Sequence, residues 1–177
     1  MIQTEREGRG AWTPLEDNRL YDLLAALGDR TEHLGRVHAA EVLGSASDPR
    51  AVAALVEALR DEHPDIRRLS ARALREIGSV RSIEPLVDRL QDPDEKWKTR
   101  MFAAEALGRI GTSSAIDGLV ARLLDPSEDV EARIAVAHIL GRASSPAAGK
   151  ALRECLQDSD PKVRKAAEQV LGNAGRV

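Results

Sequence analysis

Residues 66–78 read Ile66-Arg-Arg-Leu-Ser-Ala-Arg-Ala-Leu-Arg-Glu-Ile-Gly78, and a similar stretch, Arg100-Met-Phe-Ala-Ala-Glu-Ala-Leu-Gly-Arg-Ile-Gly111, follows further along the chain. In both stretches, apolar or small residues recur at intervals of three and four, which is the pattern of one face of an α-helix. A glycine closes each stretch, as expected just past the end of a helix. The two stretches therefore predict two equivalent amphipathic helices.

The same pattern occurs five times along the chain. In each unit a leucine follows an arginine by seven residues: Arg36/Leu43, Arg67/Leu74, Arg100/Leu107, Arg133/Leu140 and Arg164/Leu171. Upstream of each lies a pair of leucines four residues apart, Leu23/Leu27, Leu55/Leu59, Leu86/Leu90, Leu119/Leu123 and Leu152/Leu156. Each unit therefore reads as two helices. Because one helix pair cannot bury its apolar face alone, the five pairs are expected to stack.

Segments rich in Asp and Pro, such as Asp92-Pro93 and Asp125-Pro126, separate the two helices of a unit, because Asp caps a helix and Pro fits its first turn. Thr13-Pro14-Leu15-Glu16 has the form of a capping box that starts the first helix at residue 14. We expect helices near residues 14–27, 33–44, 49–60, 64–77, 82–91, 95–109, 113–124, 129–142, 146–157 and 161–173. Residues 1–12 are predicted to be a flexible tail. Residues 13–177 are predicted to form one domain with repeats at 14–46, 47–79, 80–112, 113–144 and 145–177.

Residues 18–175 resemble the HEAT-like repeat of phycobilin lyase subunits, the PBS-lyase HEAT-like repeat, most clearly in the two stretches quoted above. The resemblance implies an all-α fold: a right-handed α-α superhelix, or HEAT-like solenoid, of five helix pairs. It also implies that the second helices line the concave side. It leaves function open, because this repeat occurs both in scaffolds and in bilin lyases.

The balance of charge disfavours nucleic acid as the partner. The 177 residues carry 26 Lys and Arg against 29 Asp and Glu, a net charge of −3, whereas phosphate binding favours a basic excess. Arg67, Arg68, Arg72 and Arg75 form a local basic group, but Glu41 and Glu105 occupy the equivalent outward position on the neighbouring helices and interrupt it.

The single cysteine, Cys155, excludes an internal disulfide and fits a reducing compartment. The first residues lack the apolar segment of a signal peptide, and no apolar run reaches the length of a membrane span. We therefore expect a cytoplasmic protein that does not associate with membranes.

Catalytic and metal-binding motifs are missing from the sequence. Deoxyhypusine hydroxylase, which shares the repeat, holds iron through His-Glu dipeptides, and none occurs here; the four histidines are His33, His38, His63 and His138. Cys155 lies beside a core leucine, where apolar surroundings make a thiol inert. We expect no metal, no cofactor and no catalytic residues.

The repeated arginines, called the arginine ladder below, are interpreted as structural: Arg36, Arg67, Arg100, Arg133 and Arg164. An Asp lies six residues before three of them, at Asp61, Asp94 and Asp158. An arginine that reaches back to loop carboxylates or carbonyls would tie successive repeats together.

On each second helix, the positions one, five and eight residues after the ladder arginine are expected to face away from the core. On the central repeats this side and the nearby loop combine apolar and charged residues, as contact patches do. Either it is a solvated face with scattered apolar residues or it is a groove for a partner. We favour a groove formed by Arg68, Arg72, Trp97, Met101, Glu105, Ile134 and His138. The sequence thus predicts a non-catalytic scaffold that binds a partner protein or peptide on its concave face; the alternative is a bilin lyase or chromophore-handling chaperone subunit.

Overall fold

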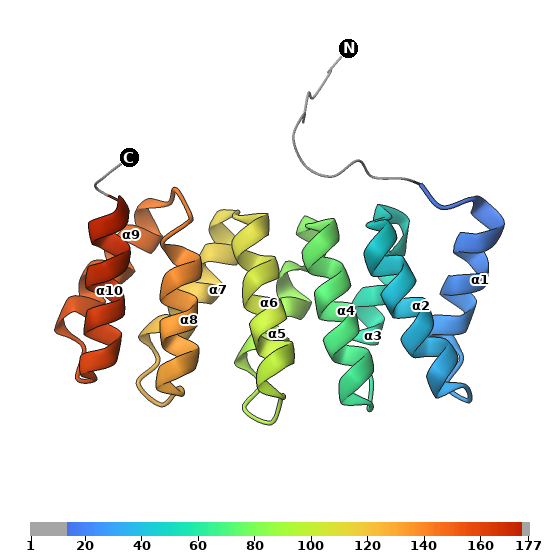
Figure 1. The fold of residues 1–177 in the computed structure, drawn as a ribbon, viewed down its shortest axis with the longest axis horizontal. Helices are drawn as coiled ribbons and strands as arrows, with labels where there is room; N and C mark the ends of the chain where they lie inside the picture. Colours follow the sequence, from blue (N-terminus) through green and yellow to red (C-terminus); the bar gives the residue numbers. More distant parts are fainter. Residues whose placement is uncertain (1–13, 175–177) are drawn as a thin grey trace, which may run out of the picture.

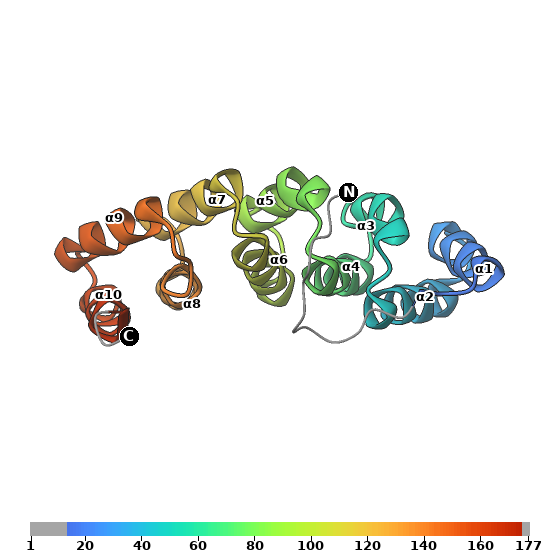
Figure 2. The ribbon, with the colours of Figure 1, turned by 90° about the horizontal axis from the view of Figure 1, so that it is seen from above.

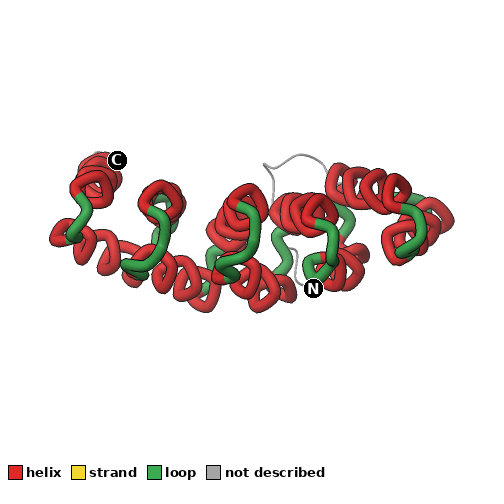
Figure 3. The backbone as a smooth tube through the Cα atoms, turned by 90° about the horizontal axis from the view of Figure 1, so that it is seen from below, coloured by secondary structure: helices red, strands yellow, loops and turns green. Residues whose placement is uncertain are grey.

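The computed structural model describes residues 14–174, and over that range it contains helices and loops but no strand (Figures 1 and 3). The α-helices are α1 (Asp17–Gly28), α2 (His33–Ala46), α3 (Val52–Ala58), α4 (Pro64–Ile77), α5 (Ile83–Gln91), α6 (Trp97–Ile110), α7 (Ser113–Leu124), α8 (Val130–Leu140), α9 (Pro146–Glu154) and α10 (Pro161–Ala174). Short 3₁₀-helices at Pro49–Ala51, Val80–Ser82 and Cys155–Gln157 extend α3, α5 and α9. The predicted all-α solenoid of helix pairs is confirmed. The predicted tail at 1–12 lies outside the described residues.

The helices form two layers (Figure 2). The first helices of the pairs, α1, α3, α5, α7 and α9, make one row, and the second helices make the other. The double row follows a shallow arc, with the second helices on its inner, concave side (Figure 2). None of the described helices is long and apolar enough to cross a membrane.

The core lies between the two rows and is continuous along the array. The repeated leucines are its largest recurring side chains: Leu55, Leu86 and Leu119 of the first helices are fully buried, as are Leu74 and Leu107 of the second. Alanine fills most of the remaining buried positions, which lets helices with few aromatic residues approach closely.

The first helix begins at Asp17 rather than at residue 14, and the predicted capping box depends on Thr13, which lies outside the described residues. The backbone of Leu15 is instead bonded to the second repeat. Its carbonyl accepts from Arg50 Nη2 at 2.7 Å and its N–H donates to Asp48 Oδ2 at 3.4 Å. These bonds hold Leu15 outside the helix.

Four glycines lie eight residues after a ladder arginine, where an outward-facing position is expected; Gly172 is exposed, but the other three do not face outward. Gly44, Gly108 and Gly141 lie where one second helix meets the next. A Cβ on Gly44 would lie 2.9 Å from Cβ of Ala73, and Cβ atoms on Gly108 and Gly141 would collide with Ile139 and Val170. The missing side chain therefore permits the close stacking of the second helices.

A stability gain is expected at the end of α2. Gly78 and Gly111 end α4 and α6 in the left-handed conformation, but Ser47 adopts it after α2, with φ of 53°. Because a side chain disfavours this conformation, Ser47→Gly is expected to raise the free energy of unfolding by ~0.5–1 kcal/mol. Denaturant melts of both proteins measure it. Ala46→Gly places glycine at the preceding position, inside α2, and should instead lower the free energy of unfolding. Equal effects of the two changes would contradict the assignment.

Candidate partner-binding site

An apolar cavity opens on the concave layer between α6 and α8, and two of the predicted partner-binding residues line it. Its volume is about 320 Å³, at the lower end of the range usual for small-molecule pockets. Trp97 begins α6 and is 62% exposed, and Met101, one turn further, is half-buried. We call this space the α6–α8 cavity.

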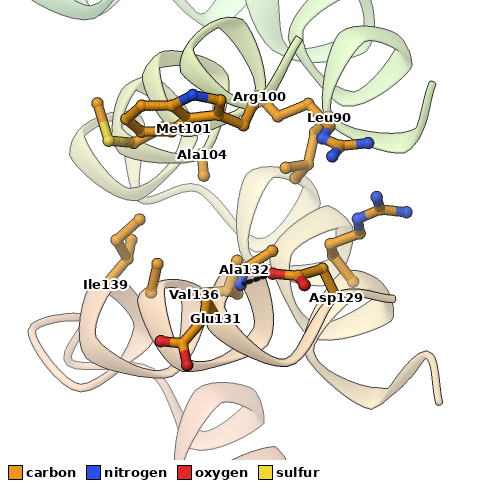
Figure 4. A pocket seen from close by; sticks show the side chains of 12 residues that line it. Leu90, Arg100, Met101, Ala104, Asp129, Glu131, Ala132, Val136 and Ile139 are labelled. Carbon is orange, nitrogen blue, oxygen red and sulfur yellow. Dashed lines mark hydrogen bonds between the residues drawn. The ribbon is translucent and has the colours of Figure 1, made fainter. Parts of the chain in front are cut away.

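The walls of the cavity come from facing helices (Figure 4). Ala104 of α6 points toward Val136 and Ile139 of α8, and Met101 also lines the cavity from α6. Leu90 of α5 lies at the end of the cavity where Arg100 extends (Figure 4). Val136 is 3% and Ile139 7% exposed, so the α8 wall is part of the core surface rather than loose side chains. Such a surface can hold an apolar group of a ligand.

The other predicted partner-binding residues do not line this cavity. Arg68 pairs with Asp65 at 3.5 Å, and Arg72 lines a separate, polar cavity between α2 and α4. Glu105 pairs with Arg75 across the α4–α6 junction, with 2.5 Å between Oε2 and Nη1. Thus the structure gathers only part of the predicted groove at one place.

Ile134 and His138 of α8 were both expected to face a partner. His138 is exposed, but Ile134 is half-buried and packs against the core. Ala135, between them, is exposed and lines the α6–α8 cavity.

The arginine ladder connects each repeat to the next at three of its positions. Arg36 pairs with Asp61, a contact buried on both sides, and Arg133 pairs with Asp158. Arg67 Nε donates to Glu95 Oε2 at 2.6 Å. In each pair the carboxylate belongs to the following repeat.

The ladder arginines also bond to loop carbonyls that precede their own helix. Arg67 Nη1 donates to the carbonyl of Asp61 at 2.8 Å, and Arg164 Nη1 donates to that of Asp158 at 2.7 Å. Asp61 and Asp158 thus each accept hydrogen bonds from the arginines of two successive repeats, one through the side chain and one through the backbone carbonyl. Asp94 does not act this way: Arg100 follows Leu90 by ten residues, whereas Arg67 follows Leu59 by eight, and Glu95 takes the position.

Glu95 shows how strongly these junctions hold a carboxylate. Burial would raise its pKa, but the hydrogen bonds from Arg67 and from the Lys96 N–H outweigh burial, and the pKa lies below its usual value. Glu95 therefore stays ionised within the junction.

Arg100 lacks the carboxylate from the following repeat that Arg36, Arg67 and Arg133 have; Arg164, in the last described repeat, also bonds to carbonyls alone. Among residues 14–174 Arg100 has no carboxylate within salt-bridge distance, and its only hydrogen bonds run from Nη1 to the carbonyls of Asp92 and Pro93, both at 3.4 Å. The carboxylate that matches Glu95 one repeat later is Glu128, and it pairs with Arg122 instead. Both Arg100 and Arg122 line the α6–α8 cavity.

Cys155 and the histidines supply no reactive cluster in the described part of the chain. Burial raises the pKa of the Cys155 thiol, which keeps it protonated. The rings of His33 and His63 lie 4.7 Å apart, yet between residues 14 and 174 no three His, Cys, Asp or Glu side chains gather as metal ligands do.

Several cavity residues were missed by sequence reasoning, among them Leu90, Arg122, Ala132 and Ala135. They belong to three helices and share no sequence pattern, so only the folded chain brings them together. The one available indication was the interval between the second leucine and the ladder arginine, which is ten residues in the third and fourth repeats and contains Glu95 and Glu128.

The architecture and the concave cavity define the class of protein: an α-solenoid built from helix-pair repeats. Family models agree, since the model for HEAT repeats matches residues 20–97 and 124–176, and the model for the PBS lyase HEAT-like repeat matches residues 99–125. The chain belongs to the HEAT repeat family.

A similar curated protein is the phycocyanobilin lyase subunit alpha of Picosynechococcus sp., which is 37% identical over 47% of this chain and 34% of its own length. The chain thus spans about a third of that relative. Two solved structures are similar in fold. The complex of CpcE and CpcF of phycocyanin lyase from Nostoc sp. has a TM-score of 0.61 at 24% identity over 90% of this chain and 66% of its own. Designed armadillo repeat proteins for modular peptide recognition have a TM-score of 0.59 at 20% identity over 88% and 82%.

Proposed function

We propose that the protein is a non-catalytic scaffold that binds a partner protein or peptide on its concave face, centred on the α6–α8 cavity. The observation that carries this proposal is the cavity itself. An apolar space of about 320 Å³ opens beside an indole that is 62% exposed, on the layer of second helices. Exposed aromatic residues beside apolar pockets are typical anchors of protein interfaces.

Two further observations support a preformed surface. Val136 and Ile139 of the cavity wall are buried in the core of the array, so little rearrangement is needed for binding. The similarity in fold to designed proteins that recognise peptides indicates that such double rows are suited to this use.

The test removes the anchor and fills the cavity. Trp97→Ala combined with Ala135→Glu changes two exposed residues, so the free energy of unfolding should change by less than ~1 kcal/mol. Affinity capture from the native organism, quantified by mass spectrometry, is expected to lose a defined set of proteins with this variant.

The matched control is Tyr21→Ala with Ala121→Glu, which makes an equivalent pair of changes at exposed positions of α1 and α7. It should retain the captured proteins. If the cavity variant retains them too, the proposal is wrong and the remaining concave surface must be tested.

A second function is favoured by the 37% identity to a phycocyanobilin lyase subunit alpha: participation in chromophore attachment or handling. Its test is incubation with phycocyanobilin followed by gel filtration with visible absorbance detection. Co-migrating chromophore that depends on Trp97 would favour this function. Absence of chromophore at the protein peak favours the scaffold.

A further inference from the structure

The charge on the wall of the α6–α8 cavity indicates what kind of partner it accepts. Two guanidinium groups, of Arg100 and Arg122, line a space whose other walls are mainly apolar. Two acidic residues also line it, Asp129 and Glu131. Each of the four charges can be followed to its partner.

The acidic side chains are already engaged. Asp129 caps α8 by accepting the N–H of Ala132 at 3.1 Å, as the dashed line in Figure 4 marks. Glu131 pairs with Lys162 of the next repeat at 3.0 Å, and Figure 4 shows its carboxylate directed away from the cavity. Neither carboxylate is left to neutralise a guanidinium in the cavity.

The guanidinium groups are less well satisfied. Glu128 pairs with Arg122, whose side chain is 10% exposed, and the buried Nε–H of Arg122 has no acceptor among the described residues. Burial and then the nearby charge of Arg100 lower the pKa of Arg122, and the charge of Asp125 opposes them only in part. Arg100 uses only Nη1, so its Nε and Nη2 donate to nothing within residues 14–174.

We propose that the α6–α8 cavity recognises a segment of a partner protein that carries Asp or Glu beside a bulky apolar side chain. The apolar side chain enters between Met101 and Val136, and the carboxylate accepts from Nε and Nη2 of Arg100. This bidentate geometry is the strongest that a guanidinium makes with a carboxylate. The carboxylate also supplies the negative charge that Arg36, Arg67 and Arg133 receive within the array and that Arg100 lacks. The inference rests on the proposed function.

A protein segment suits the site better than an isolated small carboxylate because the cavity is not closed. It opens beside the exposed Trp97, on a concave row that continues along α4 and α10 (Figures 1 and 2). A peptide chain can lie along that row while one side chain fills the cavity.

The experiment uses the full chain and a display library of short random peptides. Peptides selected on the unchanged protein are expected to share Asp or Glu next to Leu, Ile, Phe or Trp. Synthetic copies should bind Arg100→Gln about tenfold or more weakly, since a hydrogen bond to a charged group is lost. Arg100→Glu should select peptides in which Lys or Arg replaces the acidic residue. The matched control, Arg153→Glu, makes the same charge change at an exposed position of α9 and should leave binding unchanged.

Three outcomes overturn the inference: selected peptides that lack an acidic residue, affinities that are the same for Arg100→Gln and the unchanged protein, and failure to select any peptide. Decanoate is tested in parallel, and binding of decanoate without selection of peptides assigns the cavity to a small carboxylate, which also overturns the inference.

If Trp97→Ala with Ala135→Glu abolishes partner capture but Arg100→Glu does not, the proposed function stands and only the acidic recognition fails. Circular dichroism of each variant verifies folding. The guanidinium makes only two long hydrogen bonds, so the fold should persist.

Discussion

Arg36→Ala is expected to lower the free energy of unfolding by ~3–5 kcal/mol, because it removes one partner of a buried ion pair. The Arg36 and Asp61 side chains are 4% and 5% exposed, and Arg36 Nε also donates to the Leu27 carbonyl at 3.2 Å. Without the guanidinium, Asp61 keeps a buried charge, and the Leu27 carbonyl loses its donor. Denaturant unfolding followed by circular dichroism measures the loss.

Two further variants separate the buried charge from other effects. Arg60→Ala removes an arginine whose pair with Glu57 is exposed on both sides, 60% and 75%, so its cost should stay below about 1 kcal/mol. Arg36→Met combined with Asp61→Leu replaces both partners by apolar groups and should recover much of the lost stability. A loss below about 1 kcal/mol for Arg36→Ala would contradict the structural role of this pair.

The fold could be predicted from the sequence because the same pattern of buried and helix-ending residues occurs five times. Each unit places leucines on one side of two helices and Asp, Pro or Gly between them, and the observed helices begin and end within a few residues of the expected positions. The difference at α1 arises from bonds between Leu15 and residues Asp48 and Arg50, far along the chain. Local pattern carries no information about such contacts.

The candidate site could be predicted only in part. Trp97 and Met101 stood out because apolar side chains occupied positions expected to face water, and both line the cavity. Ile134 occupies an equivalent position but packs against the core, since the outward direction of a helix depends on how far it rotates toward its neighbours. The glycines that set this spacing, Gly44 and Gly108, were expected to face outward for the same reason.

The arginine ladder illustrates the same limit in electrostatic terms. Its recurrence indicated a structural role, but the partner of each arginine depends on the spacing between leucine and arginine in the following repeat. Where that interval is ten residues instead of eight, Glu95 replaces an aspartate, and one repeat later Glu128 pairs with Arg122 and leaves Arg100 without a carboxylate among the described residues. The proposed recognition of an acidic segment rests on this departure from the regular pattern.

Leu107→Ala is expected to cost ~2–5 kcal/mol, the usual range for truncation of a buried leucine. Leu107 is fully buried in α6, at the centre of the array. Because a solenoid is stabilised by contacts between neighbouring repeats, a void here weakens the junctions on both sides.

Two other leucines serve as controls for this effect. Leu171 has the same place in the last repeat, is half-buried and has a repeat on one side only within the described residues, so Leu171→Ala should cost less. Leu34 is 80% exposed, and Leu34→Ala should change the free energy of unfolding by less than about 0.5 kcal/mol. Equal losses for Leu107→Ala and Leu171→Ala on denaturant melts would mean that the array unfolds independently of where the void lies, which contradicts stabilisation by neighbouring repeats.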